Sequence, residues 1–343
     1  MTGPPSLTAS PSVVAVGAAA IDEWYAVSNL PEADGGAYAS EVRTAFGGVG
    51  ANVAVALDRL GRDVGLVSRV GDDEYGRRAR ENLATTGVDA SRVRIGADPS
   101  TRSVILCDPD GERAIVTAGE SFRELRLDEA DRETIATADI VFLTAYTPDA
   151  VAEGVLDLVC STADPPRLVF DLSGPVEELV DRGTEPKTIH RYLHRADVFV
   201  AGDVAAEAYF GGDDAAVRRI VAAQRARDRT RSNIDGEADA ADRAGWPRAV
   251  LTHGASGMTV IADGKVSDLD AFGVDPVDAT GAGDAFVAGL IDQWLAGDAA
   301  VESGVRFAAA VAAINCTSRF TQPGRPDRER VETFLAERSH ERR

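Results

Sequence analysis

The chain has 343 residues, of which 44% are hydrophobic and 27% are charged, a composition typical of globular proteins rather than disordered ones. Its 36 basic and 56 acidic side chains give a formal net charge of −20, which argues against nucleic acid and anionic membranes as partners because like charges repel. No apolar run approaches the roughly 18 residues of a membrane span. We expect a cytoplasmic protein.

The balance of basic residues adds an expectation about the host. All but two of the basic residues are arginine, the lysines being Lys187 and Lys265. Concentrated salt shortens the Debye length to about 3 Å at 1 M, so a very acidic surface with little lysine indicates a halophilic host. A genome rich in G and C, which favours arginine codons, is the alternative.

The predicted elements begin after a flexible Pro- and Ser-rich leader, residues 1–12. A strand is expected over Val13–Gly17 and a helix over Ala51–Leu60, which ends before a glycine. A β-branched run, Val64–Val67, predicts a second strand, and Glu74–Thr86 is helical in pattern. Strands that alternate with helices in this way indicate a parallel sheet.

Two segments interrupt the alternation. Hairpins are expected within residues 21–46 and 101–118, where short alternating runs flank turn residues. They predict a small antiparallel sheet that stands off the main body as a lid.

The second half of the chain returns to short, continuously apolar strands, each preceded by a helical stretch. The strands are Ile140–Leu143, Leu168–Phe170, Val198–Val200 and Val250–Thr252. Strands of this kind are buried on both faces, so we expect one α/β domain over residues 13–338, with a doubly wound, mostly parallel sheet. Residues 211–245 are rich in Asp, Arg and Ala and predict a flexible insertion, whose first half is compatible with a helix.

The strongest chemical signal is the stretch DATGAGDAF, Asp278–Phe286, which runs into a predicted helix. Small residues let the backbone approach a ligand, and a helix N-terminus offers unpaired N–H groups, so this is an anion hole. Asp284 would repel a phosphate there unless it removes a proton from an attacking hydroxyl. Its alternative role is to stabilise the helix N-terminus.

Three motifs in order resemble the ribokinase family, also called the PfkB carbohydrate-kinase family. DATGAGD resembles its C-terminal signature, FGGVGANVA at Phe46–Ala54 resembles its N-terminal signature, and LTHGASG at Leu251–Gly257 resembles its nucleotide loop. The resemblance covers roughly Val13 to Leu335. It implies a ribokinase-like fold with a β-sheet lid.

The resemblance also implies roles for individual residues. Asp284 matches the catalytic base, and Gly281, Ala282 and Gly283 match the anion hole. Asp278 matches a residue near a monovalent-cation or water-mediated Mg²⁺ site. Positions that hold the sugar are matched by Asp22, Gly48 and Asn52, and positions beside the nucleotide phosphates by Thr252, Gly254 and Gly257. The implied cofactors are ATP and Mg²⁺, with K⁺ left open, and a homodimer is left open too.

The sequence departs from the family in places. Many relatives carry the motif N-x-x-E at a Mg²⁺ site. Here Glu207 matches the Glu of this motif, but Val204 replaces the Asn. Alternatively, Glu207 is an exposed helix residue with no metal role. Ser173 stands where several relatives have the Asn of D-x-N. Arg102, which enters the lid, is a candidate for binding a carboxylate or phosphate of the substrate. Arg43, on the other lid strand, is a candidate for the same role. A plain surface arginine is the alternative for both.

These observations predict an ATP-dependent kinase that phosphorylates a primary hydroxyl of a ribose-type substrate: ribose, ribose 1-phosphate or a nucleoside. A hexose or sugar acid, such as fructose or 2-keto-3-deoxygluconate, is the alternative substrate. A non-catalytic sugar or nucleotide sensor on the same fold is the alternative of another class. The intact Asp284 argues against the sensor, since a sensor needs no base.

Overall fold

The computed structural model describes residues 12–232, 248–262, 264–295, 299–320, 322 and 324–341. In this part of the chain a large sheet has the strand order β13-β12-β11-β10-β9-β8-β1-β4-β5. Its strands are β1 Val13–Val16, β4 Val64–Gly71, β5 Val93–Gly96, β8 Ile140–Thr144, β9 Arg167–Asp171, β10 Val198–Gly202, β11 Arg248–Thr252, β12 Met258–Ala262 and β13 Lys265–Leu269. All neighbours are parallel except β11–β12 and β12–β13.

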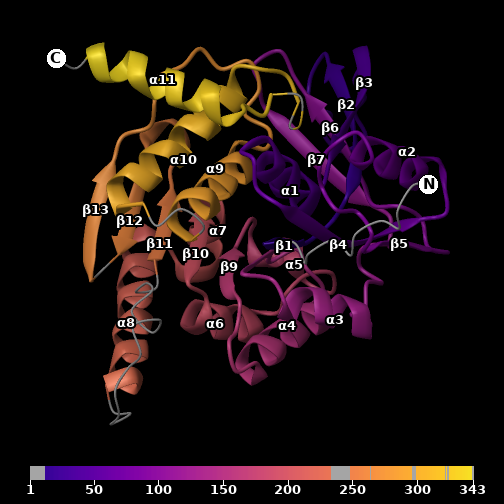
Figure 1. Ribbon diagram of the computed structural model, residues 1–343. Coiled ribbons are helices and arrows are strands. Elements are labelled where there is room, and N and C mark those ends of the chain that lie inside the picture. Colours follow the sequence, from indigo (N-terminus) through magenta and orange to yellow (C-terminus); the bar gives the residue numbers. More distant parts are fainter. Residues whose placement is uncertain are drawn as a thin grey trace, which may run out of the picture.

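Helices cover both faces of this sheet (Figure 1). They are α1 Val49–Arg59, α2 Glu74–Leu83, α3 Glu129–Ala136, α4 Asp149–Ser161, α5 Val176–Leu179, α6 Pro186–Arg195, α7 Asp203–Phe210, α8 Asp213–Ser232, α9 Ala282–Leu290, α10 Val301–Cys316 and α11 Arg328–Glu341. Along β1, Val13 and Ala15 join the core beneath α1 and α9, while Val14 and Val16 join the core beneath α4 and α6. The continuously apolar strands are thus buried on both sides, as predicted.

The topology fixes where a ligand binds. The chain leaves β1 through α1 to β4 on one side, and β8 pairs with β1 on the other side. Such a reversal of strand order opens a crevice at the carboxyl ends of the strands. Residues that follow β1, β8, β9, β10 and β11 therefore meet at one edge of the sheet.

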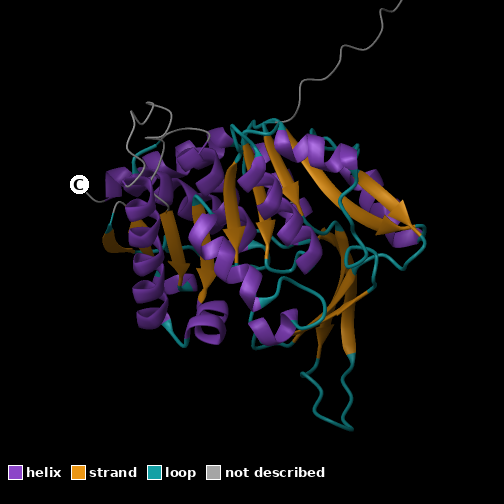
Figure 2. Ribbon diagram, turned by 90° about the horizontal axis from the view of Figure 1, so that it is seen from below, coloured by secondary structure: helices purple, strands orange, loops and turns teal. Residues whose placement is uncertain are grey.

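The lid is the second, smaller sheet, with strand order β3-β2-β6-β7. Its strands are β2 Ala20–Val27, β3 Ala39–Gly47, β6 Arg102–Cys107 and β7 Arg113–Ala118. They project from the body, as Figure 2 shows. The two segments predicted to form the lid therefore do form one sheet, although β2 and β6 pair in parallel.

Two regions differ from the predicted elements. Residues 213–232 form α8, which packs Ala216, Ile220 and Ala223 into the core; the first half of the segment 211–245 is thus a helix, as the sequence allowed, although it packs on the body rather than standing apart as an insertion. The rest of that segment, and the leader up to residue 11, lie outside the described residues. The β12–β13 hairpin, which was not among the predicted elements, extends the sheet. Its signal in the sequence is the dipeptide Asp263-Gly264, which is common in hairpin turns. Across the described residues, the helices lack the combination of length and apolar character that spanning a bilayer requires.

Candidate active site

The anion-hole loop lies at the start of α9. Gly281 is the N-cap residue, with φ 72° and ψ 10°, a left-handed conformation that favours glycine. Among the residues that the structure describes, no side chain caps this helix end, and the first turn of a helix carries N–H groups without intrahelical acceptors. The Ala282 N–H donates to the Ala279 carbonyl at 3.2 Å, whereas a side chain added at Gly283 would enter open space. An anion is therefore best received at Gly283 and Asp284.

Asp284 stands on the first turn of α9 and points back toward α1. Its Oδ2 accepts a hydrogen bond from Asn52 Nδ2 at 2.8 Å and lies 3.8 Å from Arg325 Nη2. Burial raises the pKa of this carboxyl, while the Arg325 charge and the Asn52 hydrogen bond lower it. The structure thus brings two of the predicted residues, from motifs more than 200 positions apart, into direct contact.

A chain of amides fixes the orientation of Asn52. Asn82 Nδ2 donates to Gln322 Oε1 at 2.7 Å, and Gln322 Nε2 donates to Asn52 Oδ1 at 3.2 Å. Because the Asn52 oxygen is taken as an acceptor, its NH₂ group must face Asp284. The α10–α11 loop, which supplies Gln322, carries no motif, so no sequence signal marked this residue.

Asp22 lies on β2, at the lid end of the crevice. It is 8% exposed. Burial raises its pKa to about 6, a hydrogen bond from Ser103 on β6 acts against this, and the charge of Asp284 raises the pKa further. A side chain at Gly47 would overlap the Asp22 carboxylate, and one at Gly48, the N-cap of α1 with φ 87°, would overlap the Ala18 carbonyl. The first two glycines of the N-terminal signature are therefore required by packing.

Asp171 is a third carboxylate, at the carboxyl end of β9. It is buried, and Ser173 donates to its Oδ2 at 2.7 Å from a backbone with φ 55°. Burial raises its pKa to about 6, and the charge of Asp284 contributes to the rise. The charge of Asp284 thus acts on both Asp22 and Asp171, and a group of carboxyls with raised pKa is typical of functional sites.

The nucleotide loop follows β11. His253 N–H donates to the Gly257 carbonyl at 2.8 Å and closes the turn from Thr252. Gly254 and Gly257 have φ 54° and 106°, and a side chain at Gly257 would overlap the Leu269 carbonyl of β13. The three predicted residues of this loop lie on one tight turn at the carboxyl end of β11, on the side of the sheet where the parallel strand β1 also ends.

Asp278 holds the start of the anion-hole loop. Its Oδ1 accepts the Thr280 N–H at 2.8 Å and its Oδ2 accepts the Phe320 N–H at 3.0 Å. An ionised carboxylate has about four acceptor positions, so capacity is left for a hydrated cation. The oxygen donor fits Mg²⁺ or K⁺, which prefer oxygen ligands.

Glu207 is exposed on α7, one turn beyond Asp203. Within the described part of the chain, Asp203, Asp213 and His253 do bring metal-ligand atoms within 4.8 Å of one another. His253 Nδ1 lies 2.5 Å from Asp203 Oδ1, and its Nε2 lies 3.1 Å from Thr259 Oγ1. These contacts hold the His253 ring in place at the turn that follows β11.

Arg102 does not reach the crevice. It pairs with Ile21 across the lid, so its side chain lies on the sheet face opposite Asp22, where its guanidinium is 5.1 Å from the centre of the Tyr75 ring. The substrate contact expected of Arg102 is not supported, because neighbouring strand positions point to opposite faces.

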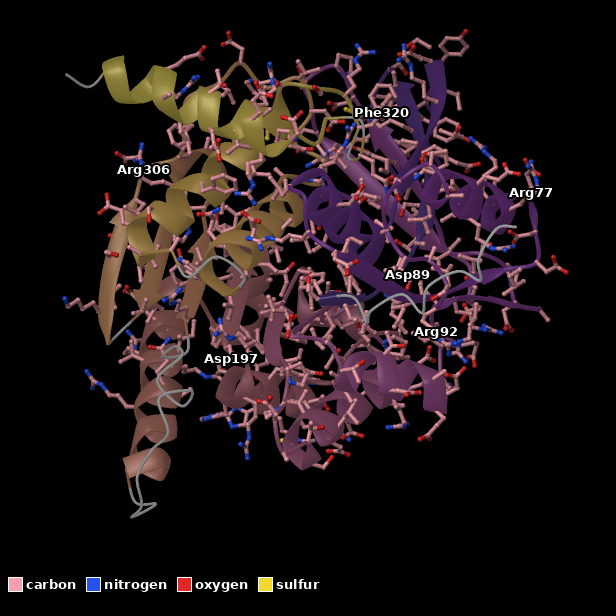
Figure 3. The ribbon with its side chains drawn as sticks, in the orientation of Figure 1. Arg77, Asp89, Arg92, Asp197, Arg306 and Phe320 are labelled. Carbon is pink, nitrogen blue, oxygen red and sulfur yellow. The ribbon has the colours of Figure 1, made fainter. Side chains whose placement is uncertain are left out.

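Other arginines occupy the face of the lid that carries Asp22. Arg43 on β3 and Arg319 on the α10–α11 loop both pair with Glu41, and Arg113 Nη1 on β7 donates to Thr280 Oγ1 at 2.7 Å. Phe320, labelled in Figure 3, packs edge-on against Trp24 of β2. The lid thus touches both the anion-hole loop and the loop that carries Arg325.

Comparison with known proteins agrees with this geometry. An ATP-dependent ribose-1-phosphate kinase from Halopiger xanaduensis is 33% identical over 320 residues, which cover 91% of this chain and 94% of that relative. Its source agrees with the halophilic host that the charge balance predicts. A ribokinase from Bacillus subtilis is 26% identical, with 95% of this chain and 99% of that relative covered.

Solved structures show the same fold. The structure of Arabidopsis thaliana ribokinase complexed with ribose and ATP matches with a TM-score of 0.75 at 23% identity and covers 95% of this chain and 99% of that one. Residues 10–328 match the model of the pfkB family carbohydrate kinases. The protein therefore belongs to the pfkB family of carbohydrate kinases, enzymes that phosphorylate sugar hydroxyl groups.

Proposed function

We propose that the protein transfers the γ-phosphoryl group of ATP to a primary hydroxyl of a ribose-type substrate, and that ribose 1-phosphate is its best substrate. The observation that carries the proposal is the contact of Asn52 with Asp284 on the first turn of α9, beside the open space at Gly283. A base, an anion hole and a polar sugar pocket then share one crevice.

The chemistry follows from these positions. The Asp284 carboxylate accepts the proton of the substrate hydroxyl, whose oxygen forms a bond to the γ-phosphorus. The bond from that phosphorus to the bridging oxygen of ADP breaks, and ADP leaves. N–H groups at the start of α9 stabilise the charge on the transferring group. Asp22 and Asn52 hold sugar hydroxyls, and Thr252, Gly254 and Gly257 form the nucleotide loop.

A cation completes the proposed site. Mg²⁺ supplies charge neutralisation for the ATP phosphates, and Asp278 is the carboxylate that would hold it through water. Glu207 is the second candidate of the sequence analysis; its exposed place on α7 supports this role less. K⁺ is proposed only as an alternative occupant near Asp278.

Two observations support a phosphorylated sugar. The ribose-1-phosphate kinase relative is one, and the arginines on the Asp22 face of the lid are the other. Arg43 and Arg319 share the single carboxylate of Glu41, which leaves excess positive charge beside the pocket. Arginine is well suited to bind phosphate through paired N–H donors.

A coupled assay of ATP consumption tests this proposal, run with Mg²⁺ in about 2 M KCl to screen the protein's charge. The substrates are ribose, ribose 1-phosphate, nucleosides, fructose and 2-keto-3-deoxygluconate. We expect the highest kcat/KM for ribose 1-phosphate. No turnover of any substrate by a folded sample that binds ATP would instead support the sensor.

The double variant Arg43→Met/Arg319→Met tests the phosphate contact. We expect kcat/KM for ribose 1-phosphate to fall about tenfold or more while that for ribose stays within about threefold, since a charge-assisted hydrogen bond contributes about 1.5–3 kcal/mol. Arg102→Met, on the other lid face, is the matched control. Equal losses for ribose and ribose 1-phosphate would contradict the assignment.

The homodimer left open by the sequence is also a proposal. Tyr38, Val42, Ile115 and Val116 of the lid region are exposed apolar side chains, which suit an interface between two lids. Sedimentation at several protein concentrations would reveal it.

A further inference from the structure

The α10–α11 loop places a buried guanidinium against the anion-hole loop. Arg325 is 3% exposed, and its Nη1 donates to the Gly281 carbonyl at 2.8 Å. Its Nη2 lies 3.8 Å from Asp284 Oδ2. Among the described residues, neither Nε nor Nη2 finds a hydrogen-bond acceptor. Burying a charge that is only partly hydrogen-bonded is costly, so this arrangement is unexpected unless it serves the site.

The surroundings of Asp284 explain why a positive charge is useful there. Asp22 on β2 and Asp171 on β9 face it with carboxylates, and the charge of Asp284 acts on both. Asn52 on α1 offers a neutral hydrogen bond. Cys316 at the end of α10 faces Arg325 as a further titratable group. Arg325 is the group in this set that carries positive charge.

This charge bears directly on the proton transfer. A base must be ionised to accept a proton, yet burial favours the protonated form of Asp284. Burial raises the pKa of Asp284, and Arg325 is the first cause that lowers it. The effect is mutual: burial lowers the pKa of Arg325 to about 10, and the charge of Asp284 opposes this decrease.

The Gly281 bond gives Arg325 a second effect. Gly281 caps α9 without help from a side chain, and its carbonyl also accepts the Ala285 N–H at 3.0 Å. A donor on this carbonyl holds the left-handed turn that aims the N–H groups of Gly283 and Asp284 into the crevice. The same guanidinium therefore contacts both parts of the proposed machinery.

We propose that Arg325 is a positioning residue for phosphoryl transfer, which keeps the Asp284 carboxylate ionised and holds the anion-hole loop through the Gly281 carbonyl. The proposal rests on the function proposed above. It assigns a role to a residue that lies outside all three glycine motifs.

The pH dependence of kcat tests the proposal in Arg325→Met and Arg325→Lys. Arg325→Met should move the acid limb of the profile to higher pH by about one unit or more, a tenfold loss of the ionised base at low pH. The KM for ATP should stay within about threefold, and kcat should recover toward high pH. Arg325→Lys keeps the charge and should keep the acid limb near that of the wild type.

Arg328→Met is the matched control, because Arg328 pairs with Asp292 rather than with Asp284. It should lower the thermal midpoint without moving the acid limb. If Arg325→Met loses activity equally at every pH, or shows the wild-type acid limb, the residue is merely structural and the proposal is overturned. If Arg325→Met does not fold, Arg325→Gln takes its place in the comparison.

A second measurement separates this proposal from the proposed function. In protein labelled with ¹³C at aspartate carboxyl carbons, the Asp284 signal is the one missing from Asp284→Asn. Its titration should lie at higher pH in Arg325→Met than in the wild type. If the wild type phosphorylates none of the sugars, the proposed function fails, and this titration still decides the role of Arg325; an unchanged titration overturns it.

Discussion

Three carboxylates share one crevice, and their burial sets much of its chemistry. Asp22, Asp171 and Asp284 come from β2, β9 and α9, and all three carboxyls have a raised pKa because they are buried. A folded protein that holds buried carboxylates at neutral pH gives up stability for function. The cost should be visible in the pH dependence of unfolding.

Asp22→Asn makes this cost measurable. The folded-state pKa of Asp22 is about 6, against an ordinary 3.8, so the folded state binds more protons than the unfolded state between about pH 4 and 6, and stability falls as pH rises through that window. Asn stays neutral and still accepts from Ser103. We expect the variant to be more stable than the wild type at pH 7.5 by about 1–3 kcal/mol.

Urea unfolding of both proteins at pH 7.5 and pH 4 measures the effect. The difference should shrink toward zero at pH 4, where Asp22 is protonated. A variant less stable by the same amount at both pH values would contradict the account. The KM for the sugar should also rise in the variant, because Asp22 is the carboxylate proposed to hold a sugar hydroxyl.

Particular residues show what the sequence can and cannot predict. The motifs and the family resemblance that they carry singled out Asp284, Asn52 and Asp22, and in the structure Asn52 donates to Asp284 and the charge of Asp284 acts on Asp22. Arg325 could not be predicted, because it is one arginine among many and its importance arises from a contact between distant segments. The sequence left Arg102 open between a substrate contact and a surface arginine, because strand register decides the direction of a side chain and a shift of one residue reverses it.

At the scale of elements, the lid is joined to the body by a few polar and aromatic contacts. The order of strands and helices was predictable from apolar runs and glycines, and a helix in the first half of residues 211–245 was compatible with the sequence. The packing of α8 against the core was not predictable, since it depends on tertiary contacts, and the edge hairpin β12–β13 was not among the predicted elements. The link from β7 to the anion-hole loop, Arg113 to Thr280, suggests that lid position and anion-hole position are coupled.

Arg113→Met tests this coupling. Arg113 is exposed, so its loss should leave the thermal midpoint nearly unchanged, while the KM for the sugar rises about threefold to tenfold because a hydrogen bond that holds the lid is lost. Arg77→Met is the control: Arg77 lies on α2 and pairs with the surface carboxylates of Glu74 and Glu81, and such exposed pairs contribute little to stability. Identical kinetics for the two variants would show that the lid closes without this contact.

At the scale of the whole molecule, net charge dominates. A charge of −20 on 343 residues produces self-repulsion that opposes the compact state and that salt screens. We expect the thermal midpoint to rise continuously from about 0.1 M to 2 M KCl, where the Debye length falls from about 10 Å to below 3 Å. A midpoint that is highest at low salt would contradict the halophilic interpretation.

The central claim is that Asp284 is the base of a phosphoryl transfer at the start of α9. The most direct test compares turnover and ligand binding for the wild type and Asp284→Asn under the same salt and Mg²⁺ conditions. The account predicts that the variant binds ATP and sugar with Kd values within about threefold, while kcat falls about 10²–10⁴-fold. Retention of more than about a tenth of the wild-type kcat would contradict it.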